Sequence, residues 1–214
     1  MIQALIFDLD SCLAPATEIG PDIVAPVFQA IRDANQGAVT PADLEAAFTD
    51  CWRFPFDFVA EKYGFSPAMR AAGYHGFRRL EVLQPLSGYG DLAVLADLPG
   101  KLFLVTTGFR RLQESKIRAL GIAPRFTGIF IDAIDAGPTP GKRPIFANIM
   151  QTQRLRPAEV LVVGDNPDSE IAAGNQLGLT TIQMLRPGVA ASEAAAHRVR
   201  NLHELKAFCA AKPE

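Results

Sequence analysis

The chain has 214 residues, of which 49% are hydrophobic and 21% charged, and this composition is typical of a globular protein with one substantial apolar core. Its 21 basic and 23 acidic residues are interspersed and give a formal net charge of −2, which argues against nucleic acid or a membrane surface as a partner. Three scattered cysteines, no signal-peptide pattern and no apolar run of about 18 residues predict a cytoplasmic protein without disulfides.

The first predicted strand ends in two carboxylates. Residues 4–7 form an apolar run that suits a strand buried on both faces, and Asp8 and Asp10 follow it directly. In an open α/β sheet, ligands bind at the carboxyl ends of the strands. Two carboxylates so close to an apolar strand stay ionised only if a positive charge, such as a divalent cation, offsets them. By itself the segment fits either a solvated acidic turn or a functional site.

From Pro15 to about Leu83 the apolar spacing is helical. A stripe over residues 23–31 predicts the first helix, and Thr40 with Pro41 caps the second. A third helix is expected after Pro55 and a fourth from Ser66 to Leu83. These segments predict a small all-helical cap domain, residues 15–84, which leaves the sheet beside the two aspartates.

An alternation of strands and helices resumes after Pro85. It predicts a doubly wound, mostly parallel α/β sheet built from residues 1–14 and 85–214. In chain order, the expected elements are a helix over 89–98, a strand over 101–106, a helix over 109–120, a strand over 128–133, a helix over 143–155, a strand over 160–163, a helix ending at Gly178, a strand over 180–185, a surface turn with a short helix over 190–196, an edge strand near 198–200 and a terminal helix over 201–211.

Polar side chains recur where the predicted strands end. Each has an ordinary interpretation as a turn, a cap or a solvated lysine. Together they supply a carboxylate nucleophile, a proton carrier, donors for anionic oxygens, a fixed cation and a metal ligand, which are the parts that phosphoryl transfer needs. The residues are Asp8 and Asp10 after the first strand, Thr106 and Thr107 after the second, Lys142 beyond the third and Asp165 after the fourth.

These segments resemble, in order, the four motifs of the haloacid dehalogenase-like (HAD) hydrolases. Asp8-Leu9-Asp10 resembles the first motif of the family, and residues 104–108 resemble the second. Lys142 resembles the third motif, and residues 164–170 resemble the fourth. The resemblance covers nearly the whole chain, and the insert lies where this family carries its helical cap. It implies a Rossmann-like HAD core and an aspartate-nucleophile phosphatase.

The resemblance also implies a role for each residue. Asp8 would attack phosphorus to form an aspartyl-phosphate, and Mg²⁺ would be held by Asp8, the backbone carbonyl of Asp10 and Asp165. Asp10 would protonate the leaving oxygen and later deprotonate the attacking water. Lys142 would offset negative charge. The phosphoryl oxygens would be held by the Thr106 hydroxyl and the backbone N–H groups of Leu9, Thr107 and Gly108. Asp168 and Glu170 would either orient metal-bound waters or serve only as acids in the first turn of a helix, where the helix dipole favours them.

Departures from the family pattern leave several points open. Asp10 favours a phosphatase, because dehalogenases proper lack this second aspartate. Cys12 replaces the usual threonine, so a poorly hydrogen-bonding thiol stands beside the site. Arg143 rivals Lys142 as the active-site cation, and Glu170 stands where relatives usually have aspartate. A phosphomutase acting on a sugar phosphate and a catalytically silent binding protein with this fold are the alternatives to a phosphatase.

Substrate specificity is expected to come from side chains of the cap. The polar candidates are Arg53, His75 and Arg78, followed by Arg79 and by Arg110 of the core. The aromatic residues at positions 52, 54, 56 and 58 suit either an apolar pocket wall or the core of the cap. The expected substrate is a small phosphate ester of unspecified class, and the sequence leaves monomer and homodimer equally open.

Overall fold

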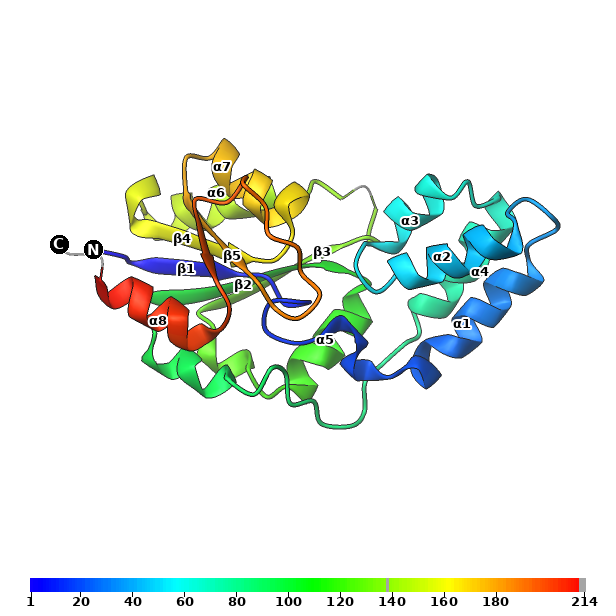
Figure 1. Cartoon of the computed structure of the whole chain (residues 1–214), viewed down its shortest axis with the longest axis horizontal. Helices are drawn as coiled ribbons and strands as arrows, with labels where there is room; N and C mark the ends of the chain where they lie inside the picture. The colour runs from blue at the N-terminus through cyan, green and yellow to red at the C-terminus, as the bar shows by residue number, and fades with distance from the viewer. Residues whose placement is uncertain (138, 212–214) are drawn as a thin grey trace.

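The computed structural model describes residues 1–137 and 139–211. It has a six-stranded parallel sheet in the order β3-β2-β1-β4-β5-β6, with helices on both faces (Figure 1). The predicted doubly wound α/β fold is therefore confirmed. The strands are β1 Ala4–Phe7, β2 Lys101–Gly108, β3 Gly128–Ala133, β4 Val160–Gly164, β5 Thr180–Met184 and β6 His197–Val199.

Alternate residues of β1 face opposite sides of the sheet and belong to different apolar clusters. Leu5 and Phe7 pack in the cluster that includes α5 (Arg110–Ala119) and α8 (Leu202–Ala211). Ala4 and Ile6 pack in the cluster that includes α6 (Lys142–Gln153). The continuous apolar run predicted from the sequence is therefore a strand covered on both faces, as parallel sheets require.

The strand order brings three of the predicted strand ends together. β1 lies between β2 and β4, with Phe7 paired to Leu104 on one side and to Val163 on the other. The chain leaves β2 toward one edge of the sheet and β4 toward the other. This is the topological switch point at which ligands bind in doubly wound sheets.

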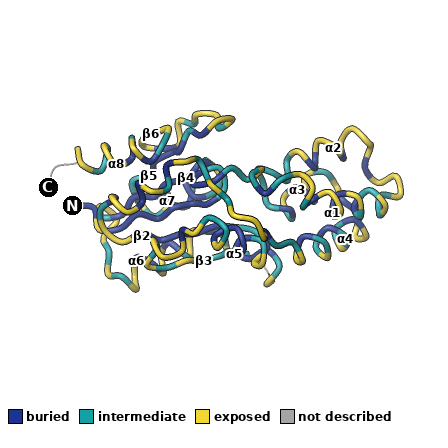
Figure 2. Tube along the Cα trace, turned by 90° about the horizontal axis from the view of Figure 1, so that it is seen from below, coloured by how far each residue is buried: buried dark blue, intermediate teal, exposed yellow. Residues whose placement is uncertain are grey.

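The insert after β1 packs around an apolar cluster of its own, at the end of the molecule beyond the carboxyl ends of the strands (Figures 1 and 2). Phe109 and Ile134 of the α/β part join this cluster, so the two parts share an apolar contact. The insert comprises α1 Pro21–Asp33, α2 Pro41–Asp50, α3 Phe56–Lys62 and α4 Pro67–Phe77, preceded by a 3₁₀ turn at Ala16–Ile19.

The helix predicted over residues 66–83 is too long. α4 ends at Phe77, and Leu83 is exposed. The backbone after α4 instead bonds to α5, because the Val82 N–H donates to the Ser115 hydroxyl at 2.9 Å and the Leu86 N–H donates to the Ala119 carbonyl at 3.0 Å. These bonds return the chain to the sheet and are incompatible with a continuing helix.

Three shorter predictions differ from the structure in detail. Residues 89–98 form only a 3₁₀ helix, Leu92–Asp97, and Gly88 and Gly90 hold left-handed φ angles just before it. The helix predicted to stop at Gly178 does end just before that residue, but it consists of a π-helical turn, Pro167–Ile171, followed by α7, Ala172–Gln176. Residues 190–196 are turns without a helix, since the Gln183 side chain bonds to the backbone of Ala190 and Ser192.

Candidate active site

A buried cluster of three carboxylates and one ammonium lies at the carboxyl ends of β1 and β4. The Lys142 ammonium is 2.8 Å from a carboxylate oxygen of Asp8 and 2.9 Å from one of Glu170. One oxygen each from Asp8, Asp165 and Glu170 lie within 4.8 Å of one another. With all groups ionised, the cluster keeps two formal negative charges that Lys142 does not neutralise.

Two local features place Glu170 in this cluster. Its other carboxylate oxygen accepts the backbone N–H of Asn166 at 2.6 Å, which fixes the side chain across the π-helical turn. The end of β4 gives it room, because a Cβ on Gly164 would lie 2.3 Å from the Glu170 side chain. Asp168, expected beside Glu170, is exposed and lies outside the cluster of Asp8, Asp165 and Glu170.

Burial shifts the acids of this cluster toward their neutral forms. It raises the pKa of Asp8 to about 7, although the Lys142 ammonium acts in the opposite direction. Burial, reinforced by the charges of Glu170 and Asp8, raises the pKa of Asp165 to about 8. A bound divalent cation would reverse both shifts. The carboxylate oxygens are hard donors of the kind that Mg²⁺ prefers, so the residues present fit such an ion.

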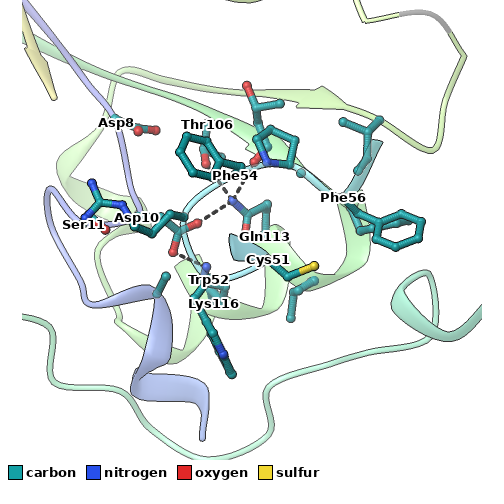
Figure 3. A pocket seen from close by; sticks show the side chains of 18 of the residues that line it. Asp8, Asp10, Ser11, Cys51, Trp52, Phe54, Phe56, Thr106, Gln113 and Lys116 are labelled. Atoms are coloured by element: carbon teal, nitrogen blue, oxygen red, sulfur yellow. Dashed lines mark hydrogen bonds and ion pairs between the residues drawn. The ribbon is translucent and has the colours of Figure 1, made fainter. Parts of the chain in front are cut away.

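Asp10 is held by two side chains of α5 that the sequence analysis did not single out (Figure 3). One carboxylate oxygen of Asp10 forms an ion pair with the Lys116 ammonium. The other accepts a hydrogen bond from the Gln113 amide at 2.9 Å. Lys116 is 3% exposed and Gln113 is 2% exposed, so α5 turns two polar side chains toward the site from its buried face.

Gln113 also links Asp10 to the end of β2. Its amide nitrogen lies 2.7 Å from the Thr106 hydroxyl oxygen and 3.2 Å from the Thr107 carbonyl oxygen. With Gln113 as the donor, the Thr106 oxygen accepts and its own proton remains available for an anionic oxygen. Thr107 and Gly108 also line the cavity, whereas Leu9 is fully buried and lies in the turn between Asp8 and Asp10.

Cys12 faces away from the site. Its side chain is fully buried, and the thiol donates to the Val163 carbonyl at 3.7 Å. The Cys12 carbonyl accepts from Arg186, which also forms a bidentate pair with the buried Asp91. The residue that replaces the usual threonine therefore supports the loop behind the two aspartates and does not line the cavity.

Arg53 and Arg78 bridge the insert and the α/β part. Arg53 donates to the Gly188 carbonyl at 2.8 Å, and its guanidinium is 3.8 Å from Asp165. Arg78 donates to the Asp135 carbonyl at 2.6 Å. Arg53 lines the cavity at the cluster, whereas Arg78 does not belong to the lining that the structure describes.

The other cationic candidates are exposed. His75 contacts Arg79 on the surface of α4, Arg110 lies near Glu114, and Arg143 is exposed where Lys142 is buried. None of these four lines the cavity around Asp8 in the described part of the chain. The cationic side chains brought to that cavity are Arg53, Lys116 and Lys142.

The cavity measures about 150 Å³ and lies between the strand ends and the insert. At the strand ends it is polar and holds the carboxylate cluster, Asp10 and Thr106. Toward the insert its wall is mostly apolar and includes Trp52, Phe54 and Phe56, whereas Phe58 is exposed on α3 (Figure 3). Phe56 also belongs to the apolar cluster of the insert, so the aromatic run serves both as pocket wall and as core.

The spacing of Gln113 and Lys116 in the sequence indicates that both lie on the buried face of their helix. They follow the second motif, on the helix whose first turn starts at that motif, and they lie four and seven residues after the buried Phe109. In a helix these positions share one face. Two polar residues on an otherwise buried face are the pattern that would have identified them.

Comparison with known proteins indicates the family to which this chain belongs. A sequence model of the haloacid dehalogenase-like hydrolases matches residues 2–178. The chain is 25% identical over 205 residues to a glyceraldehyde 3-phosphate phosphatase of Methanopyrus kandleri, covering 87% of this chain and 85% of that protein. It is 25% identical over 149 residues to the pyrimidine 5'-nucleotidase YjjG of Escherichia coli, covering 70% of this chain and 63% of that protein.

Among solved structures, a HAD phosphatase of Thermococcus onnurineus has the same fold. The two chains are 19% identical, each is covered to 97%, and the TM-score is 0.63. No helix in residues 1–137 and 139–211 combines the length and apolar character needed to cross a bilayer. Because the family model matches most of the chain, the protein belongs to the haloacid dehalogenase-like hydrolases, and its phosphatase relatives support a phosphomonoester hydrolase within that family.

Proposed function

We propose that this chain is a Mg²⁺-dependent phosphatase that hydrolyses a small phosphate monoester through an aspartyl-phosphate on Asp8. The observation that carries the proposal is the buried cluster of Asp8, Asp165, Glu170 and Lys142 beside the carboxylate of Asp10. A nucleophile, a fixed cation and an oxygen-donor set lie together at a topological switch point of the sheet. Residues 1–14 and 85–214 would form the catalytic core, and residues 15–84 the cap.

The metal would be held by the carboxylates of Asp8 and Asp165, the backbone carbonyl of Asp10 and, directly or through water, Glu170. When bound, it would neutralise negative charge on the phosphoryl group and on the carboxylates. Lys142 would fix the Asp8 carboxylate and offset charge on a phosphoryl oxygen. This role falls to Lys142 in preference to the exposed Arg143, since the Lys142 ammonium lies 2.8 Å from Asp8.

The remaining residues would position the substrate and move the proton. The Thr106 hydroxyl and the backbone N–H groups of Leu9, Thr107 and Gly108 would hold phosphoryl oxygens. The Asp8 carboxylate would attack phosphorus as the ester bond breaks, and Asp10 would give a proton to the departing oxygen. Asp10 would then accept a proton from the water that hydrolyses the aspartyl-phosphate. Lys116 and Gln113 would keep its carboxylate in place through both steps.

The test is turnover of a phosphate-ester panel that includes p-nitrophenyl phosphate, with excess Mg²⁺ and with EDTA. Release of inorganic phosphate only with Mg²⁺ is expected. Incubation in ¹⁸O-labelled water should label the released phosphate, whereas a phosphomutase would transfer its phosphoryl group mainly to a sugar. No turnover of any ester, together with no thermal shift on adding Mg²⁺, would leave only a silent protein with this fold. We also expect a cytoplasmic location, given the three scattered cysteines.

A further inference from the structure

The two ends of the active-site cavity offer different chemistry to a substrate. The phosphoryl group would occupy the polar end, at Asp8 and Lys142. The leaving group would then extend toward the insert, where the wall is apolar and aromatic. The side chains that define this wall are Ile19, Phe28, Trp52, Phe54, Phe77 and Phe109.

Most of the polar side chains near this wall already have partners. The Gln113 amide donates to Asp10 and lies against Thr106, and the Lys116 ammonium pairs with Asp10. Arg53 donates to the Gly188 carbonyl and faces Asp165. These contacts hold Asp10 and the insert in place, and each engages part of the hydrogen-bonding capacity of the side chain.

The other uncharged polar side chains of the cavity belong to both parts of the chain. On the insert they are the Trp52 indole N–H and the Cys51 thiol, and on the α/β part they are the hydroxyls of Ser11, Thr107 and Ser169 and the Asn166 amide, which lie at or just after the ends of β1, β2 and β4. Burial raises the pKa of the Cys51 thiol to about 12, so it is neutral and a weak donor. Among the described residues from the insert that line the cavity, none carries a carboxylate. A hydroxyl moved from water to the insert side of the cavity would lose hydrogen bonds that the aromatic and aliphatic side chains there do not replace.

The size of the cavity restricts the leaving group further. Its volume of about 150 Å³ must hold the phosphoryl group as well. An apolar cavity of about this volume holds a ligand of the size of benzene. With the insert in its present position, this volume favours a leaving group of a few atoms beside the phosphoryl group over one of the size of a nucleoside.

We infer that the natural substrate is a phosphate monoester whose leaving group is small and apolar, a short alkyl or phenyl group without several hydroxyls. This inference rests on the proposed function and adds the substrate class to it. It differs from what the names of the relatives suggest, since glyceraldehyde 3-phosphate and pyrimidine nucleotides carry polar leaving groups.

The decisive comparison is n-propyl phosphate against glycerol 3-phosphate, which have the same three-carbon chain and differ by two hydroxyls. Glycerol is the more acidic alcohol and therefore the better leaving group, so intrinsic reactivity works against the expected result. We expect kcat/KM to be about 10- to 100-fold higher for propyl phosphate, as an apolar pocket discriminates against added hydroxyls to roughly this extent. Glyceraldehyde 3-phosphate and UMP should have kcat/KM values lower than that of glycerol 3-phosphate.

Phe54→Ala tests whether the wall produces this preference. The variant should reduce the ratio of the two kcat/KM values by about tenfold, because burial against Phe54 favours the apolar propyl chain more than the hydroxylated chain. Phe208→Ala makes the same change on α8, away from the cavity, and should leave the ratio unaltered. If Phe54→Ala does not fold, inhibition of the wild-type enzyme by propylphosphonate and by 2,3-dihydroxypropylphosphonate gives the same comparison without turnover.

The two proposals fail in distinguishable ways. Absence of turnover with every ester, including p-nitrophenyl phosphate, would refute the phosphatase. Turnover with a kcat/KM for glycerol 3-phosphate equal to or above that for propyl phosphate would refute the apolar leaving group and leave the phosphatase intact. Equal inhibition by the two phosphonates would also refute the apolar leaving group.

Discussion

At one end of the cavity lie three buried carboxylates, two of which pair with one buried ammonium, whereas at the other end aromatic and aliphatic side chains form the wall. The polar end is built from the ends of β1, β2 and β4 and is fixed by the sheet. The apolar end is built largely from the insert, which meets the sheet through Arg53, Arg78 and the apolar contact of Phe109. Under the proposed function, reaction chemistry and substrate choice would therefore reside on separate parts of the chain.

Asp8→Asn is expected to have the largest effect, because it removes the proposed nucleophile and nearly preserves the volume of the side chain. Turnover should fall by roughly 10⁴-fold or more. The fold should persist, as measured by circular dichroism and thermal unfolding, since Lys142 keeps its contact with Glu170. Asp22→Asn makes the same change on an exposed turn of α1 and should leave turnover intact. Residual turnover within tenfold of wild type would mean that another group attacks phosphorus.

Lys116→Met should produce the next largest effect, because it removes the cation that holds Asp10. We expect kcat to fall by roughly 10- to 100-fold, because Asp10 is the proposed carrier of both proton transfers, while KM changes by less than about threefold. The exposed Lys101→Met is the matched control, and Lys116→Arg should restore part of kcat. Unchanged kcat in Lys116→Met would show that Gln113 alone positions Asp10.

How far the sequence alone predicts this site depends on the element that carries each residue. Asp8, Thr106 and Asp165 follow apolar strands, and strand order then brings them together, so pattern and topology suffice. Gln113 and Lys116 contact Asp10 from α5, the helix that follows β2. A lysine on a helix, taken by itself, is ordinarily interpreted as solvated.

The apolar end of the cavity was less predictable. Phe56 contacts both the cavity and the core of the insert, and apolar periodicity is the same for either role. Residue type alone identifies the polar cap candidates, yet His75 lies on the surface, and of these candidates in the described chain only Arg53 lines the cavity. Which face of an insert helix meets the active site follows from packing of the two parts, which local pattern does not encode.

The stability of the metal-free protein should depend on pH through the polar end. Asp8 and Asp165 have pKa values of about 7 and about 8 in the folded chain, above the ordinary 3.8 of an unfolded aspartate. The folded state therefore binds more protons between about pH 4 and pH 8, and stability falls as the pH rises through that window. Bound Mg²⁺ would remove this loss by compensating the ionised carboxylates.

Thermal unfolding with EDTA and with excess Mg²⁺ measures this effect. We expect Mg²⁺ to raise the Tm by roughly 5–10 °C near pH 8 and by less than half as much near pH 5. Asp165→Asn should weaken both the Mg²⁺ shift and its pH dependence. A Mg²⁺ shift that is the same at both pH values would mean that the carboxylate cluster is not where the ion binds.

The smallest expected effect concerns Ser11, which lies where the polar end meets the apolar end. Its φ of 56° is in the left-handed region, which costs a residue with a Cβ about 1 kcal/mol. Ser11→Gly should relieve this strain, although the more flexible unfolded chain offsets part of the gain, and the Tm should rise by about 1–3 °C. Ser11→Ala keeps the strain and removes only the hydroxyl, so it should leave the Tm nearly unchanged. If kcat/KM for propyl phosphate and kcat/KM for glycerol 3-phosphate are both the same in the two variants and in wild type, Ser11 acts only through its backbone. A loss with glycerol 3-phosphate alone, in both variants, would instead identify the Ser11 hydroxyl as a polar contact to the leaving group.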